Sequence, residues 1–228
     1  MSRDFDAALI DLDGTLLDTV GDLAAATNRM LRALGRAECA PGQVATYIGK
    51  GIPRLVHRAL TGDMSRDADA VTFDRAQAIF EAAYAAESGL SAVLFAGALE
   101  GLARFRAGGI KLACVTNKAR RFTVELLERT ALAEYFDVIV CGDDTAKRKP
   151  DPMPFVVACD RLHVAPHRAL VIGDSANDMI GGRAAGCTVF AVPYGYNEGE
   201  SVASLPADRI VASIDIAAQF VLGPNPEP

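Results

Sequence analysis

Four short, largely apolar runs, each followed by a polar or glycine-containing turn, constrain the fold of this chain more than any other feature. They are rich in β-branched residues and cover residues 7–12, 111–115, 138–141 and 169–172. Such runs are typical of strands buried on both faces of a sheet. Helical periodicity follows the second and third runs, in residues 121–130 and 154–162. Strands that alternate with helices predict a parallel α/β sheet.

The spacing of the first two runs predicts an inserted domain. A βαβ crossover takes about 30 residues, whereas these two runs lie roughly 100 residues apart in the sequence. The intervening stretch has helical periodicity over residues 22–34, 52–60 and 71–86, and Thr19 and Asp22 are spaced as a capping box. We therefore predict a helical cap inserted just after the first strand.

The predicted fold class is α/β, a Rossmann-like doubly wound parallel sheet core with an inserted helical cap domain. We place the core at residues 1–17 and 93–222 and the cap at residues 18–92. The last six residues, 223–228, are rich in Gly and Pro. They are expected to form a loose tail.

Composition excludes several classes of function. The formal net charge of −6, from 23 Lys+Arg and 29 Asp+Glu, makes nucleic acid an unfavourable partner. The odd number of cysteines, 5, indicates neither a disulfide framework nor a zinc site. No apolar stretch is long enough to span a membrane or to form a secretory leader. We expect a cytoplasmic protein with no membrane partner, and a monomer and a homodimer both remain open.

The candidate chemistry lies in the turns that follow the predicted strands. In a parallel α/β sheet these turns converge at the carboxyl ends of the strands. They contain, in chain order, Asp11-Leu-Asp13-Gly-Thr, Thr116-Asn117, Lys149-Pro150 and Gly173-Asp174 with Asp178 beyond. We expect these polar side chains to form one site.

Asp11 is the candidate nucleophile. The pattern Asp-x-Asp-Gly-Thr occurs by chance in on the order of one in a thousand chains of this size. A pair of this kind can also form a simple capped turn. Asp11, however, ends a buried run, where a carboxylate is costly without a cation or hydrogen-bond donors.

Carboxylates that converge with open positions favour Mg²⁺ over zinc, and Asp174 would supply the third of them. Pro166 separates His163 from His167, so these histidines are not aligned as metal ligands, and His57 is interpreted as a surface or packing residue. A carboxylate 4 Å from a phosphate dianion is repelled by about 8 kcal/mol at a dielectric constant of 20. Magnesium, Lys149 and the Thr116 hydroxyl would remove that barrier.

In this order the four segments resemble the motifs of the haloacid dehalogenase superfamily of hydrolases over essentially the whole chain. Within it, the chain most resembles the phosphoglycolate phosphatases, through residues 47–51, 148–152, 173–178 and 194–197. The resemblance implies a magnesium-dependent phosphatase that acts on a small phosphate monoester, with 2-phosphoglycolate as the expected substrate and glycolate and phosphate as products.

The resemblance also implies roles for individual residues. Asp11 would become an aspartyl phosphate, and Asp13 would protonate the leaving alkoxide and then deprotonate water. Magnesium would be held by Asp11, Asp174 and the backbone carbonyl of Asp13. Thr116, Asn117 and Lys149 would bind substrate, and Asp178 would support the site.

Two basic residues in the cap, Lys50 and Arg54, are candidates for binding a substrate carboxylate or a second phosphate. Lys50 lies between two glycines, where phosphoglycolate phosphatases often have a small polar residue. Helix-end charge explains the pair equally well, and Lys147 and Arg148 are interpreted as a solvated basic loop.

Three other functions stay open for the same sequence. A sugar phosphomutase of the superfamily, or a phosphatase for another sugar phosphate or nucleotide, would use the same core. A non-catalytic binding module on this fold is the third. A dehalogenase is disfavoured because its reaction needs no acid like Asp13.

Overall fold

The computed structural model describes residues 4–223 of the chain, and within them a sheet of six strands forms the centre of the larger part. Its strand order is β5-β4-β1-β6-β7-β8, and each neighbouring pair is parallel. The strands are β1 (Ala7–Ile10), β4 (Lys111–Val115), β5 (Val138–Val140), β6 (Ala169–Gly173), β7 (Thr188–Ala191) and β8 (Arg209–Ile210). The predicted doubly wound parallel sheet is confirmed.

Helices cover both faces of this sheet, which explains the apolar runs. The α-helices are α5 (Ala98–Ala107), α6 (Arg120–Arg129), α7 (Met153–Leu162), α8 (Ala176–Ala184) and α9 (Ile214–Leu222). In β1, Ala8 and Ile10 pack in the core shared with α5, α6 and α9, whereas Ala7 and Leu9 pack against α7 and α8. Every side chain of this strand is therefore buried.

Short 3₁₀ segments lie in the connections of the α/β part. They are η1 (Ala133–Tyr135), η2 (Pro166–Arg168), η3 (Asn197–Gly199) and η4 (Val202–Ser204). The segment η3 follows β7 and contacts the helical part, where the Arg58 guanidinium donates to the Glu198 carboxylate at 2.8 Å.

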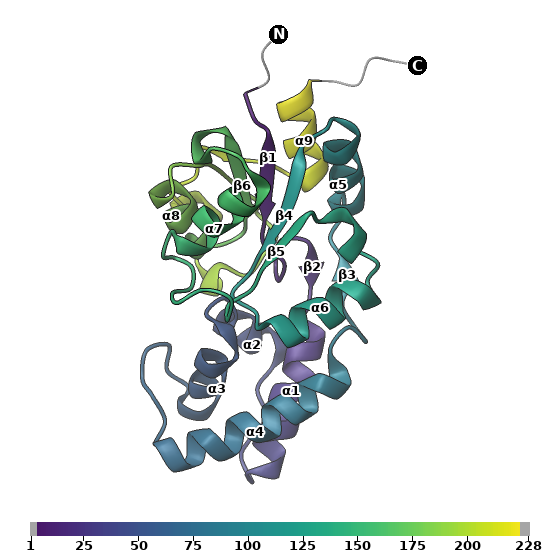
Figure 1. Cartoon of the computed structure of the whole chain (residues 1–228). Helices are drawn as coiled ribbons and strands as arrows, with labels where there is room; N and C mark the ends of the chain where they lie inside the picture. Colours follow the sequence, from purple (N-terminus) through teal and green to yellow (C-terminus); the bar gives the residue numbers. More distant parts are fainter. Residues whose placement is uncertain (1–3, 224–228) are drawn as a thin grey trace.

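The inserted region is helical and lies at one end of the sheet, on the side away from α9 (Figure 1). It contains α1 (Val20–Ala33), α2 (Pro41–Tyr47), α3 (Gly51–Thr61) and α4 (Ala70–Glu87). These helices have an apolar core of their own, centred on residues such as Met30, Val56 and Phe80. The predicted cap, residues 18–92, contains all four.

Two short strands carry the chain between the parts. β2 (Leu17–Asp18) and β3 (Val93–Leu94) pair antiparallel, so the chain enters and leaves the helical region side by side. The predicted capping box is wrong, because the Thr19 hydroxyl donates to Asp13 and makes no cap hydrogen bond. Asp22 instead accepts hydrogen bonds from Gly89 and Ser91.

The predicted tail lies outside the described residues except for Gly223. Within residues 4–223, none of the helices combines the length and the apolar character needed to cross a bilayer.

Candidate active site

Asp11 is presented at the carboxyl end of β1 by a tight turn. The strand ends at Ile10, earlier than predicted, because the Leu12 carbonyl accepts hydrogen bonds from the backbone N–H groups of Thr15, Leu16 and Leu17. Gly14 has φ +89°, and a Cβ there would lie 2.5 Å from Asp174 Oδ2. Only glycine allows this backbone to approach the carboxylate so closely.

Lys149 links Asp11 to Asp178. Its ammonium Nζ lies 2.8 Å from Asp11 Oδ1 and 2.7 Å from Asp178 Oδ1, and it donates to the Val115 carbonyl at 2.7 Å. Asp178 Oδ2 accepts a hydrogen bond from the Ser175 hydroxyl at the start of α8. The predicted residues Asp11, Lys149 and Asp178 are thus brought together from three distant segments.

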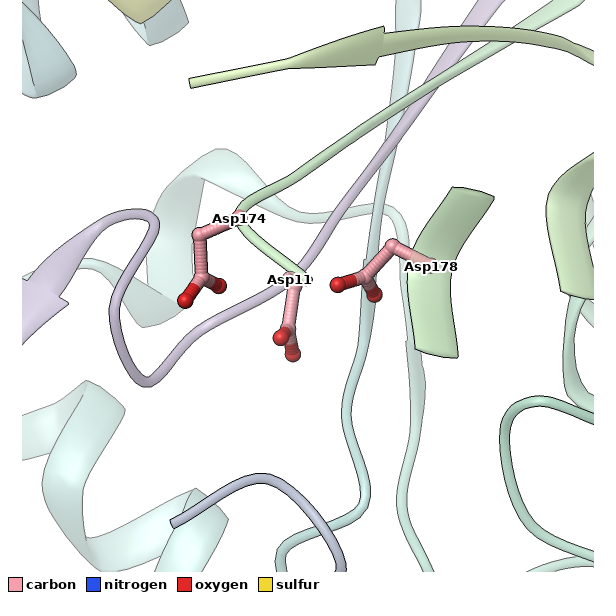
Figure 2. A group of neighbouring side chains, drawn as sticks. All are labelled: Asp11, Asp174 and Asp178. Carbon is pink, nitrogen blue, oxygen red and sulfur yellow. The ribbon is translucent and has the colours of Figure 1, made fainter. Parts of the chain in front are cut away.

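Asp174 completes an acidic cluster beside them. Its Oδ1 accepts a hydrogen bond from the Thr15 hydroxyl at 2.9 Å, and its Oδ2 accepts one from the Tyr196 N–H at 2.8 Å. One carboxylate oxygen from each of Asp11, Asp174 and Asp178 lies within 4.8 Å of the others. Figure 2 shows the three side chains, with Asp11 between the other two in this view.

Burial makes the ionised form of these carboxylates costly. It raises the pKa of Asp11 to about 8, an effect that Lys149 opposes and that the charges of Asp178 and Asp174 increase. Burial, with the charge of Asp178, also raises the pKa of Asp174 to about 6, although the Tyr196 N–H and the Thr15 hydroxyl favour its ionised form. The cluster therefore lacks positive charge.

Asp13 is held by a cation that the sequence analysis missed. Lys118 Nζ lies 2.8 Å from Asp13 Oδ1 and 2.9 Å from Oδ2, and the Thr19 hydroxyl donates to Oδ1 at 2.7 Å. Burial, the largest single effect, would lower the pKa of Lys118, but the charge of Asp13 and the interactions with Tyr84 together outweigh it and the pKa is raised. Lys118 directly follows the Thr116-Asn117 motif, and that adjacency was the available signal.

Asn117 and Thr116 have different surroundings. The Asn117 amide donates to the carbonyls of Gly49 and Lys149 and accepts from the Lys149 N–H at 3.0 Å. It therefore ties the cap loop to the Lys149 segment. The Thr116 hydroxyl oxygen accepts from the Lys118 N–H at 3.2 Å and, among the residues described, donates to no protein acceptor.

A small cavity of about 40 Å³ lies between the sheet and the cap. Its floor is formed by the predicted residues Asp11, Asp13, Thr116 and Asn117, together with Lys118. The cap side is formed by Leu23, Ile48, Gly49, Gly51, Ile52 and Leu55. A cavity of this size holds about three water molecules, so the cap lies close to the reactive carboxylates. The cap side chains that face these carboxylates are apolar.

The structure does not bring the two cap cations to this cavity. Lys50 pairs with Glu198 at 3.4 Å, and Arg54 pairs with Asp67 at 2.7 Å; neither lines the cavity. Lys147 pairs with Asp151 and is largely exposed, as expected for a solvated loop. A substrate contact by Lys50 or Arg54 remains a prediction.

Comparison with known proteins places this site in a family. The model of the haloacid dehalogenase-like hydrolases matches residues 8–192. The chain belongs to this family. The match runs from β1 through the residue after β7, and so includes each carboxylate of the acidic cluster.

Similar members of the family are bacterial enzymes named phosphoglycolate phosphatase. The one from Nitrosospira multiformis is 49% identical over 94% of this chain and 95% of its own length. The one from Thiobacillus denitrificans is 48% identical over 94% and 95%. The identity to these phosphatases, together with the family match, shows that this chain is a phosphoric monoester hydrolase.

Solved structures of the family have the same fold. A predicted phosphoglycolate phosphatase from Haemophilus somnus has a TM-score of 0.90 at 27% identity, covering 96% of this chain and 99% of its own. CbbY from Rhodobacter sphaeroides, solved with xylulose-(1,5)bisphosphate as a variant, has a TM-score of 0.74 at 26% identity and covers 92% and 95%.

The acidic cluster of this hydrolase fits a divalent cation. When ionised, its three carboxylates exceed the charge of Lys149 by two, and hard oxygen ligands suit such an ion. Asp178 accepts from the Lys149 ammonium and the Ser175 hydroxyl through both of its oxygens, whereas Asp174 accepts from two neutral donors and Asp11 contacts Lys149 through Oδ1. We therefore expect Asp11 and Asp174 to be the side chains that hold a metal.

Metal affinity should depend on pH because of Asp11. The metal-free protein binds a proton there below about pH 8, and a metal must displace that proton. Between pH 8 and pH 6 we expect the apparent affinity for Mg²⁺ to fall on the order of tenfold per pH unit. Calorimetric titration in buffers with different ionisation enthalpies would measure the released proton, and an affinity that is constant over this range would contradict the prediction.

Proposed function

We propose that this protein hydrolyses 2-phosphoglycolate to glycolate and phosphate through an aspartyl-phosphate intermediate on Asp11. The observation that carries the proposal is the position of Asp11, which lies at the floor of a small capped cavity and contacts Lys149 at 2.8 Å. The names of the similar bacterial phosphatases supply the substrate.

In the first step an Asp11 carboxylate oxygen attacks phosphorus, and the bond to the ester oxygen breaks. Asp13 donates its proton to the departing alkoxide, which leaves as glycolate. Lys149 and the Thr116 hydroxyl would bind the phosphoryl oxygens. Asn117 would act through the cap loop and the Lys149 segment, which its amide joins.

In the second step Asp13, now a carboxylate, takes a proton from water, whose oxygen attacks the phosphorus of the aspartyl phosphate. Free phosphate leaves and Asp11 is regenerated. The cap contributes by excluding bulk water from the intermediate, because Ile48, Ile52 and Leu55 form the opposite wall of the cavity.

Mg²⁺ is the proposed cofactor, held by Asp11, Asp174 and the Asp13 backbone carbonyl. When bound it would supply positive charge beside the phosphoryl oxygens. Asp178 supports the site by binding Lys149. Converging carboxylates at the carboxyl end of a sheet, with no competing His or Cys ligand in the cluster among the described residues, favour this ion.

A substrate panel tests the proposal. With Mg²⁺, the kcat/KM for 2-phosphoglycolate should exceed that for sugar phosphates and nucleoside monophosphates by at least about tenfold. Phosphate release should stop with a chelator and return with Mg²⁺. A preference for a sugar phosphate would refute the proposed substrate, and conversion of a hexose 1-phosphate to the 6-isomer without free phosphate would identify a mutase.

A further inference from the structure

Lys118 is a buried cation whose position the catalytic cycle does not by itself explain. Its side chain is 4% exposed, and its ammonium contacts both carboxylate oxygens of Asp13. Its backbone is fixed, because its N–H donates to Thr116 and its carbonyl accepts from the Gly142 N–H at 2.9 Å. The Tyr84 ring lies beside the ammonium, at 5.1 Å from the ring centroid.

The two buried lysines serve different carboxylates. Lys149 contacts Asp11 and Asp178, beside the bond that forms to phosphorus, whereas Lys118 contacts Asp13. Among the described residues that line the cavity, Lys118 is the one basic side chain. The positive charge that a ligand meets at the Asp13 end of the cavity is therefore that of Lys118.

Geometry places this charge next to the leaving group. An acid that protonates the ester oxygen must come within hydrogen-bond distance of it, and Lys118 Nζ is 2.8 Å from Asp13 Oδ1. In 2-phosphoglycolate a single CH₂ group separates the ester oxygen from the carboxylate. A carboxylate at that position would lie within reach of an ammonium that also contacts Asp13.

The other described residues that line the cavity provide no second cation for the substrate carboxylate. The cap presents the apolar side chains of Leu23, Ile48, Ile52 and Leu55, and its other two lining residues, Gly49 and Gly51, have no side chain that could pair with an anion. A desolvated carboxylate in such surroundings is unfavourable unless a cation meets it. A neutral alcohol in the same place would bring no negative charge to pair with the Lys118 ammonium, so it should bind less favourably than a carboxylate.

We propose that Lys118 determines substrate specificity by pairing with an anionic group on the leaving alcohol, one carbon from the ester oxygen. The substrate class is thus the phosphate ester of a small 2-hydroxy acid. This inference rests on the proposed function and deepens it. It assigns to Lys118 the carboxylate contact that the sequence suggested for Lys50 or Arg54.

The test compares 2-phosphoglycolate with 2-hydroxyethyl phosphate, which has the same length but no carboxylate. Wild-type protein should favour 2-phosphoglycolate by about 100-fold in kcat/KM. Lys118→Met should lose about 100-fold or more on 2-phosphoglycolate and about tenfold or less on the neutral ester. Lys118→Gln retains a hydrogen-bond donor for Asp13 without the charge, and it should lose the same preference.

The outcomes separate the two proposals. Equal losses on both esters would mean that Lys118 only positions Asp13, and this result would overturn the inference. Loss of the preference in Lys50→Met instead would also overturn it. Lys147→Met, at an exposed lysine outside the cavity, is the control that should retain the preference. Wild-type protein that hydrolyses the neutral ester but not 2-phosphoglycolate would refute the proposed function itself.

A measurement on wild-type protein makes the test independent of folding in the variants. Glycolate and ethylene glycol differ by the same carboxylate, and their inhibition constants can be compared directly. Glycolate should inhibit at least about tenfold more strongly. Equal inhibition would contradict a carboxylate site at Lys118.

Discussion

Asp11→Asn should reduce kcat by on the order of 10⁴-fold or more, because an amide cannot form the covalent bond to phosphorus. The fold should tolerate the change. Asn has nearly the same shape, and the buried carboxylate it replaces has its pKa raised to about 8. Single-turnover phosphate release, with circular dichroism to check folding, measures both expectations.

The covalent intermediate gives a second readout of the same variant. Acid quenching of wild-type protein during turnover should trap a labelled phosphoryl group that hydroxylamine removes, as an acyl phosphate requires, and Asp11→Asn should trap none. Asp69→Asn is the matched control, because Asp69 is an exposed N-cap of α4 where Asn serves equally well. Activity of Asp11→Asn within tenfold of wild type would exclude Asp11 as the nucleophile.

Lys149→Met should destabilise the protein by about 3–5 kcal/mol, since it leaves buried carboxylates without their cation. The Lys149 side chain is 2% exposed, and the Asp178 side chain that it contacts is fully buried. Turnover should also fall by at least about 100-fold, because positive charge near the phosphoryl oxygens is lost. Urea unfolding and steady-state kinetics measure these two effects.

Two further variants isolate the cause of that instability. Lys147→Met removes an exposed ion pair two residues earlier and should change stability by less than about 1 kcal/mol. Adding Asp178→Asn to Lys149→Met removes one of the uncompensated charges, so it should restore part of the stability and none of the activity. If the double variant is no more stable than Lys149→Met, charge burial is not the cause.

Four strands of the sheet, β1, β4, β5 and β6, and their parallel direction could be predicted because burial leaves a local trace in the sequence, whereas β7 was missed. Strands covered on both faces must be apolar at successive positions, as in Ala7–Ile10 and Ala169–Gly173. β8 escaped the prediction since it has only two residues, both exposed. The helix α2 was missed as well, because its seven residues are too few for a helical period to be distinguished.

The carboxylates and Lys149 could also be predicted as site residues, since parallel strands have their carboxyl ends at the same edge of the sheet. Asp11 and Asp174 follow neighbouring strands whose residues are paired in register, from Ala7 with Ala169 to Ile10 with Ile172. Sheet topology alone therefore brings these two together. The long polar segment before Lys149 gave less guidance, and its contact with Asp11 depends on the path of that loop.

The kind of fold, the acidic turn after the first strand and the resemblance to a family of phosphatases each have a local pattern, so they could be predicted without coordinates. Which cation faces which carboxylate depends instead on contacts between distant parts of the chain. Lys118 lies 105 positions from Asp13 in the chain, whereas Lys50 and Arg54, near the cap glycines, turn to Glu198 and Asp67. The residue type gives the charge of a side chain, whereas the direction in which the side chain points depends on how the cap helices pack against the sheet.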